Sequence, residues 1–192
     1  TLSLGLGATP QQILASLAPL SLSVPLIAMT YYNIVFRMGH ERFAKELASS
    51  GFSGAILPDL SMEEIGPWKS IADSTDIATI MLGAPTSSDE RLSQISELSS
   101  GFVYAVGLVG VTGERSQLAT SSIEIAKRLK AVTDKPVLVG VGISSAEQAK
   151  EVCEHADGVI IGSALIRRIL DTGSISAGLE FISEVRTALD SI

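Results

Sequence analysis

Two glycine turns in the C-terminal part of this 192-residue chain have the residue types that bind a phosphate group. In each turn, at 137–144 and 158–164, a short apolar run ends in glycine and a hydroxyl residue before a helix-like segment. Glycine lets backbone N–H groups approach an anion closely, and a helix N-terminus adds free N–H groups and partial positive charge. Two such turns after consecutive last strands form the usual phosphate site of a (β/α)8 barrel. The pattern therefore predicts that the chain handles a phosphorylated small molecule.

Side chains suited to acid–base chemistry are scarce at the expected strand ends. Asp59 follows an apolar run and is either a general base or, as the favoured interpretation, a loop residue that accepts hydrogen bonds from backbone N–H groups. Glu114 lies in a glycine-punctuated loop, 110–115, which fits a lid and an ordinary loop equally well. His40 and His155 fall away from the strand ends, so we interpret both as surface or structural residues. No lysine follows a strand, which disfavours a Schiff-base aldolase.

The composition indicates which classes of partner the chain can bind. The net charge of −7 and the isoelectric point near 4.8 disfavour nucleic acid, so phosphate binding is expected to use backbone amides. A hydrophobic fraction of 46% is ample for one large core. Cys153 is the single cysteine and is interpreted as a buried apolar residue; it excludes an internal disulfide and fits a reducing, cytoplasmic compartment. The sequence offers no zinc-ligand set, no nucleotide-binding loop, no membrane-spanning run and no signal peptide.

Apolar runs typical of buried parallel strands alternate with segments of helical period. We predict strands at 25–29, 54–57, 77–82, 102–106, 137–141 and 158–161. Helices are expected at 10–17, 40–49, 62–74, 89–99, 121–132, 146–154, 164–170 and 175–189. Thr9 before Pro10 is a helix start signal, and Ser144 with Glu147 has the capping-box spacing.

This alternation predicts an α/β fold with a parallel sheet. A closed barrel has eight strands, whereas this chain has six candidates and opens on a helix. We therefore predict a partial TIM barrel, a single domain over 1–192 that lacks the first two βα units and holds strands 3–8. The alternative is an open, doubly wound sheet of six strands that is complete as it stands.

Several of these segments resemble tryptophan synthase alpha chains in order and spacing. The matching segments are 25–33, 57–64, 84–87 with Arg91, 104–106 with 110–113, 142–144 and 157–164. The resemblance implies a lyase of tryptophan biosynthesis, which cleaves indole-3-glycerol phosphate to indole and glyceraldehyde 3-phosphate by a retro-aldol reaction. It also implies a (β/α)8 barrel without a cofactor or metal of its own. In the family this barrel assembles as α2β2 with a beta chain that holds pyridoxal phosphate.

The resemblance also assigns site residues. It implies a phosphate site of Gly113, Gly142, Gly162 and Ser163, an indole pocket of Tyr31, Tyr104, Thr112, Val141 and Ile160, and a partner-facing surface with Asn33 and Phe36. The family's catalytic Glu and Asp belong to strand 2 and the following loop, upstream of the segment that matches Thr1. We therefore expect no catalytic residue in this chain and little or no cleavage activity.

Three positions depart from the family pattern. Ile34 replaces a common proline, Gly107 a frequent serine, and Val141 a frequent phenylalanine, which makes the indole pocket wall smaller.

Two other functions stay open. One alternative is a non-catalytic, partner-binding barrel fragment whose missing strands come from another chain. The other is a different phosphate-binding barrel enzyme, such as an epimerase or isomerase, which the lack of histidine at strand ends disfavours.

Overall fold

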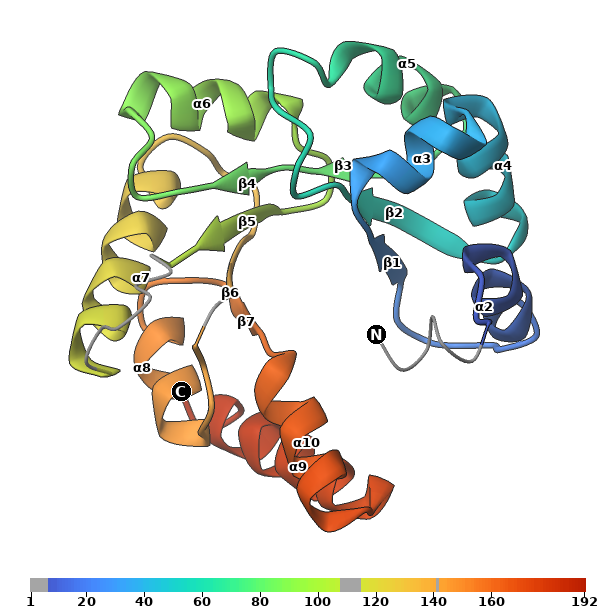
Figure 1. Ribbon diagram of the computed structural model, residues 1–192. Helices are drawn as coiled ribbons and strands as arrows, with labels where there is room; N and C mark the ends of the chain where they lie inside the picture. Colours follow the sequence, from blue (N-terminus) through green and yellow to red (C-terminus); the bar gives the residue numbers. More distant parts are fainter. Residues whose placement is uncertain (1–6, 108–114, 141) are drawn as a thin grey trace. The chain divides into compact units, whose positions relative to one another are not determined.

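Strands and helices alternate along the chain, and all strand pairings are parallel (Figure 1). The computed structural model describes residues 7–107, 115–140 and 142–192. Two compact units are present, Thr1–Met81 and Leu82–Ile192.

The first unit is a parallel sheet covered by helices. Its strands lie in the order β1 (Leu26–Met29), β2 (Phe52–Ile56) and β3 (Ala78–Ile80). Its helices are α2 (Pro10–Leu17), α3 (Tyr32–Met38), α4 (His40–Ser49) and α5 (Gly66–Ser74). Side chains that are fully buried between the helices and the sheet form the core; among the largest are Val35, Leu47, Trp68, Ile77 and Ile80.

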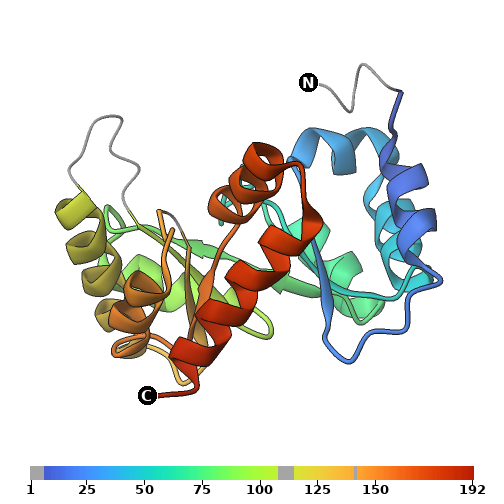
Figure 2. The same ribbon diagram turned by 90° about the horizontal axis from the view of Figure 1, so that it is seen from below.

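The second unit repeats this arrangement. Its strands lie in the order β4 (Leu82–Gly83), β5 (Val103–Val106), β6 (Val137–Gly140) and β7 (Gly158–Ile160). Its helices are α6 (Asp89–Leu98), α7 (Arg115–Lys130), α8 (Ala146–Cys153), α9 (Ser163–Thr172) and α10 (Ile175–Leu189). Helix α10 packs against both α8 and α9, as Figure 2 shows from below.

The sheet order identifies the fold class. Within each unit the strands follow one another in sequence order, and α6, α7 and α8 lie along one face of the second sheet (Figure 1). A doubly wound sheet reverses its strand order and carries helices on both faces, so that alternative is wrong. The architecture is that of a barrel wall, as predicted. The described strands do not close a barrel, because both sheets are open: β1 and β3 are the edges of one sheet, and β4 and β7 are the edges of the other.

Most predicted elements are confirmed, and three helices have the predicted bounds: α2, α4 and α10. Thr9 caps α2 as expected, in a capping box with Gln12. The predicted strand 77–82 is interrupted at Met81 to give β3 and β4, and α7 begins six residues earlier than predicted, at Arg115 rather than 121. Among the helices in the described ranges, none has the length and apolar character needed to cross a membrane.

Two local predictions are wrong. Helix α3 was not predicted, because 32–36 is rich in aromatic and β-branched residues that favour strands. The cap of α8 is Ser145 rather than Ser144: the Gln148 N–H donates to Ser145 Oγ at 3.3 Å. Ser144 instead donates its N–H to the Gln148 side chain at 2.8 Å, so Gln148 takes the place expected for Glu147.

Candidate functional site

The two glycine turns lie side by side at the carboxyl edge of the second sheet. Strands β6 and β7 are paired in register, with Gly140 opposite Ile160, so the turns that follow them are neighbours. Gly142 has φ +78°, a left-handed conformation that side chains other than glycine rarely adopt. At Gly162, no atom of the described residues other than its chain neighbours lies within 4 Å of the place that a Cβ would take. Packing against the described residues therefore does not require glycine at 162.

Helix α9 begins at this turn. Ser163 is its first residue and is exposed, and no side chain within the described part of the chain caps the helix N-terminus. The first four N–H groups of an α-helix have no partner inside the helix, and the helix dipole adds partial positive charge there. Backbone N–H groups, a hydroxyl and an absent Cβ together form an arrangement suited to a phosphate group.

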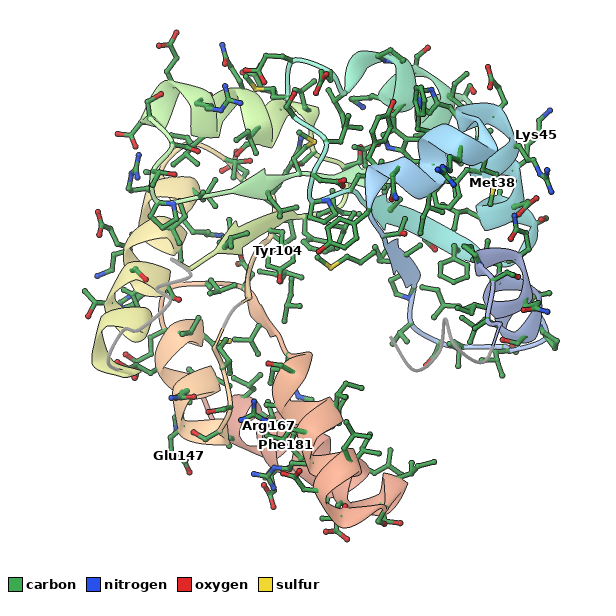
Figure 3. The ribbon with its side chains drawn as sticks, in the orientation of Figure 1. Met38, Lys45, Tyr104, Glu147, Arg167 and Phe181 are labelled. Carbon is green, nitrogen blue, oxygen red and sulfur yellow. The ribbon has the colours of Figure 1, made fainter. Side chains whose placement is uncertain are left out.

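The Tyr104 ring lies on the sheet beside these turns (Figure 3). Tyr104 is opposite Leu138 in the register of β5 and β6, so Gly140, two residues further along β6, shares its face of the sheet. A Cβ at Gly140 would overlap the Tyr104 ring and hydroxyl. Ile160 lies opposite Gly140 and is half-buried. Tyr104, Gly140 and Ile160 thus form one continuous surface on the inner face of the sheet.

Burial raises the pKa of the Tyr104 hydroxyl above its usual value, which keeps the phenol neutral at physiological pH. The surface is therefore uncharged and aromatic, which suits an apolar ring. Gly140 is the residue of this surface that we did not single out from the sequence. Its signal was a glycine at the end of an otherwise apolar strand, which often marks the close approach of another group.

Tyr31, Asn33 and Phe36 belong to the first unit, at and within helix α3. Tyr31 is the N-cap residue of α3, and all three side chains are exposed, with 66% of Tyr31 and 71% of Phe36 accessible. The Asp59 carboxylate accepts a hydrogen bond from the Tyr32 N–H at 2.8 Å. The favoured interpretation of Asp59, a residue that binds backbone N–H groups, is confirmed. This contact joins the loop after β2 to the beginning of α3.

Other candidate residues divide into structural residues and residues outside the described ranges. His40 shares a hydrogen bond of 2.9 Å with the Tyr32 hydroxyl, as expected of a structural residue. Burial raises the pKa of the half-buried Cys153 thiol, which disfavours the reactive thiolate. The described residues contain no group of three or more His, Cys, Asp or Glu side chains able to hold a metal ion. The remaining site predictions lie outside the described residues: Thr112, Gly113, Glu114 and Val141.

Comparison with known proteins identifies a family that this chain matches. The sequence model of the family described as tryptophan synthase alpha chain matches residues 1–186. The tryptophan synthase alpha chain of Streptomyces coelicolor is 48% identical over 156 residues, which cover 81% of this chain and 58% of that protein. The corresponding chain of Thermobifida fusca is 39% identical over 191 residues, covering 97% of this chain and 71% of that one. This chain therefore spans little more than half the length of the Streptomyces relative.

Solved structures agree with the sequence comparison. A Mycobacterium tuberculosis tryptophan synthase structure matches with a TM-score of 0.87 and 38% identity, covering 97% of this chain and 71% of that one. The tryptophan synthase subunit alpha of Campylobacter jejuni matches with a TM-score of 0.84 and 29% identity, covering 95% and 73%. From the family match, the identities and the shared fold, we conclude that the chain belongs to the tryptophan synthase alpha chain family.

Proposed function

We propose that this chain is the substrate-binding part of a tryptophan synthase alpha subunit, whose reaction is the retro-aldol cleavage of indole-3-glycerol phosphate to indole and glyceraldehyde 3-phosphate. The observation that carries the proposal is the N-terminus of α9, which no described side chain caps and which lies beside the turn after β6. There, backbone N–H groups and the Ser163 hydroxyl would hold the phosphate, together with Gly142, Gly162 and Gly113. Phosphate binding by backbone groups also suits a chain whose net charge is −7.

The indole ring would lie against the uncharged surface formed by Tyr104, Gly140 and Ile160. Tyr31, Thr112 and Val141 would complete the pocket, as the family resemblance implies. With the phosphate held at one end and the ring at the other, the bond between the indole ring and the glycerol chain has a fixed position. Fixing both ends of a substrate lowers the entropic part of the activation barrier.

We propose further that the 192-residue polypeptide does not catalyse this cleavage on its own. The reaction adds a proton to the indole carbon and removes one from the glycerol hydroxyl that becomes the aldehyde, so it needs an acid and a base of matched pKa. The family resemblance implies that the Glu and Asp for these steps precede the part of the family that this sequence matches. The Asp59 carboxylate is engaged with the Tyr32 N–H, which argues against a role as a replacement base.

The phosphate site is tested by titrating the chain with glycerol 3-phosphate and following heat or NMR shifts. We expect Ser163→Ala to weaken binding by about tenfold, the usual effect of losing a hydrogen bond to a charged group. Ser174→Ala is the matched control, because Ser174 is a serine at the N-terminus of another helix, α10, for which the described residues provide no side-chain cap. Equal effects of the two substitutions, or no binding by the unmodified chain, would overturn the proposal.

The proposed partner is the tryptophan synthase beta chain in an α2β2 assembly. Phe36 is a large apolar side chain on the surface of α3, and aromatic side chains of this kind anchor protein interfaces. We expect Phe36→Ala to weaken capture of a beta chain by about tenfold or more. Arg37→Ala on the same helix is the control and should change capture less than Phe36→Ala. Unchanged capture by Phe36→Ala would contradict this assignment.

The remaining proposals concern the domain, the cofactor and the compartment. We propose that residues 1–192 form one barrel domain that lacks the first two βα units, and that the barrel has no cofactor of its own because pyridoxal phosphate belongs to the beta chain. A cytoplasmic location fits the single cysteine.

A further inference from the structure

The turn between β6 and α8 is held by the side chain of Gln148. The Gln148 Oε1 atom accepts hydrogen bonds from the Ser144 N–H at 2.8 Å and from the Ser144 hydroxyl at 3.1 Å. A backbone N–H can only donate, so this contact fixes the orientation of the Gln148 amide. Gln148 also donates its own N–H to Ser145 Oγ at 3.3 Å. These three bonds join the residues before α8 to the first turn of the helix.

This arrangement differs by one residue from the capping box of α2. In α2, the Gln12 side chain accepts the N–H of Thr9, the N-cap residue itself, at 3.0 Å. In α8 the N-cap residue is Ser145, whereas Gln148 binds Ser144, the residue before the cap. The Gln148 side chain therefore reaches one residue further into the turn than a capping box requires.

The same turn contains a glycine that has much conformational freedom to lose. Gly142 has φ +78°, and glycine loses more backbone entropy on being ordered than any other residue. Fixing the backbone of one residue costs about 1–2 kcal/mol, and a ligand that had to order the turn would lose affinity by a similar amount. Ile143 is buried and anchors the turn on one side of Ser144, and Gln148 holds it on the other. The protein therefore meets the cost of ordering the turn before a ligand arrives.

These bonds also separate the roles of the two helices that begin at this edge of the sheet. The N–H groups of Ser144 and Gln148 are bound to side chains of the chain itself, so they are not available to an anion. At the beginning of α9, by contrast, no side chain of the described residues caps the helix. Helix α8 thus holds the turn in place, and α9 offers donors to a ligand.

We propose that Gln148 is a positioning residue of the phosphate site. It acts through Ser144 and does not touch the substrate. By holding Ser144, it keeps the turn over 142–145 in the conformation that places Gly142 beside the beginning of α9. This inference rests on the proposed function, because that proposal makes Gly142 a phosphate contact.

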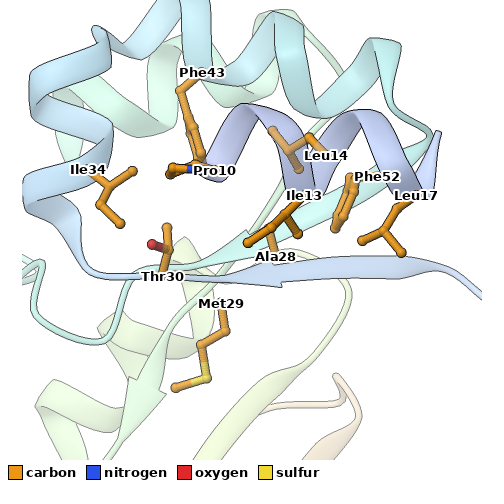
Figure 4. A pocket seen from close by; sticks show the side chains of 10 residues that line it. All are labelled: Pro10, Ile13, Leu14, Leu17, Ala28, Met29, Thr30, Ile34, Phe43 and Phe52. Carbon is orange, nitrogen blue, oxygen red and sulfur yellow. The ribbon is translucent and has the colours of Figure 1, made fainter. Parts of the chain in front are cut away.

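The test titrates the 192-residue chain and two variants, Gln148→Ala and Gln12→Ala, with glycerol 3-phosphate. Gln12 is the matched control because it makes the same kind of bond at the beginning of α2. Helix α2 belongs to the first unit, where its apolar side chains border a groove beside β1 (Figure 4). We expect Gln148→Ala to weaken binding about fivefold, the equivalent of one ordinary hydrogen bond. Gln12→Ala should leave binding within about twofold of the unmodified chain.

Two further measurements separate positioning from general stability. Urea unfolding should show similar losses for Gln148→Ala and Gln12→Ala, since each removes one side-chain bond at a helix beginning. Amide hydrogen exchange of Ser144, followed by NMR, reports the bond itself and should be faster in Gln148→Ala. Gln148→Glu keeps an acceptor oxygen and should restore the slower exchange; because it also adds a negative charge, its phosphate affinity is not compared.

The outcomes distinguish this inference from the proposed function. If the unmodified chain binds glycerol 3-phosphate and the two alanine variants bind it equally well, the inference is wrong and the proposed function stands. Unchanged exchange of the Ser144 amide in Gln148→Ala would also overturn the inference. If the unmodified chain does not bind glycerol 3-phosphate, the proposed function fails, and the inference fails with it.

Discussion

Gly140 allows the Tyr104 ring to pack closely against strand β6. A Cβ at this position would overlap the ring, and the flanking strands β5 and β7 hold Gly140 on both sides. We predict that Gly140→Ala lowers the free energy of unfolding by about 1–3 kcal/mol, the usual cost of overpacking. Gly162→Ala is the control, since its Cβ would contact no described residue other than its chain neighbours. Urea denaturation measures both; an unchanged midpoint for Gly140→Ala would contradict the described packing.

Gly107 departs from the family pattern, and the structure gives a reason. A Cβ at Gly107 would overlap the hydroxyl of Ser122, a buried residue of α7. We predict that Gly107→Ser destabilises the chain and that Ser122→Ala in the same molecule removes most of that loss. The coupling between the two substitutions should be on the order of 1–2 kcal/mol in a double-mutant cycle of unfolding free energies. Strictly additive effects would show that Ser122 does not explain the glycine.

The Asp157 carboxylate makes stability depend on acid pH. Burial alone would raise its pKa, but the Val137 N–H at 2.7 Å and the Lys130 ammonium at 2.9 Å lower the pKa below the usual value. Because the pKa of Asp157 is lower in the folded state than in the unfolded state, the ionised carboxylate stabilises the folded protein at pH values above the unfolded-state pKa. That pKa is about 3.9 for Asp. This stabilisation is lost as the pH falls through the folded value.

We predict that Asp157→Asn lowers the free energy of unfolding at pH 7 and that the difference from the unmodified chain shrinks below about pH 4. Urea unfolding at several pH values measures this. Asp171→Asn on α9 is the control for removing one exposed negative charge. A difference for Asp157→Asn that stays constant down to pH 2 would be inconsistent with the described hydrogen bonds.

The beginning of helix α3 is stabilised by a residue of the loop that follows β2. Asp59 accepts the Tyr32 N–H at the beginning of α3, and Val35 is fully buried beneath the helix. We predict that Asp59→Ala costs about 1 kcal/mol of unfolding free energy, as loss of an N-terminal cap does, and that Asp59→Asn costs less because it keeps an acceptor oxygen. Urea unfolding of both variants checks this. Equal losses from the two would contradict a hydrogen-bonding role.

The same helix shows what could not be predicted from the sequence. Helices with a local start signal or a clear apolar period, such as α2 and α10, could be bounded from the sequence alone. Helix α3 could not, because its sequence favours a strand and its stabilising partner, Asp59, is 27 positions away. The cap of α8 was misplaced by one residue because Ser144 and Ser145 offer the same chemistry, and only the backbone conformation separates them.

At the scale of the whole molecule, the fold class and the two neighbouring turns followed from strand–helix alternation and glycine spacing. Individual side-chain contacts did not: the packing of Tyr104 on Gly140 and of Ser122 against Gly107 depends on strand register and side-chain direction, which the alternation of strands and helices does not fix. The apolar residues left exposed also required the structure. They lie on α9 and α10 at Ile166, Leu170, Ile175 and Leu179, and on the first unit around α2 and β1.

Under the proposed function, the phosphate and indole contacts of the alpha chain fold belong to this chain, whereas the acid and the base do not. The most direct measurement is indole release from indole-3-glycerol phosphate by the 192-residue chain, compared with an intact tryptophan synthase alpha chain at equal concentration. We predict no release above the uncatalysed background in a preparation that still binds glycerol 3-phosphate. Release at a rate near that of the intact chain would contradict the account and would assign the proton transfers to Asp59 or Glu114.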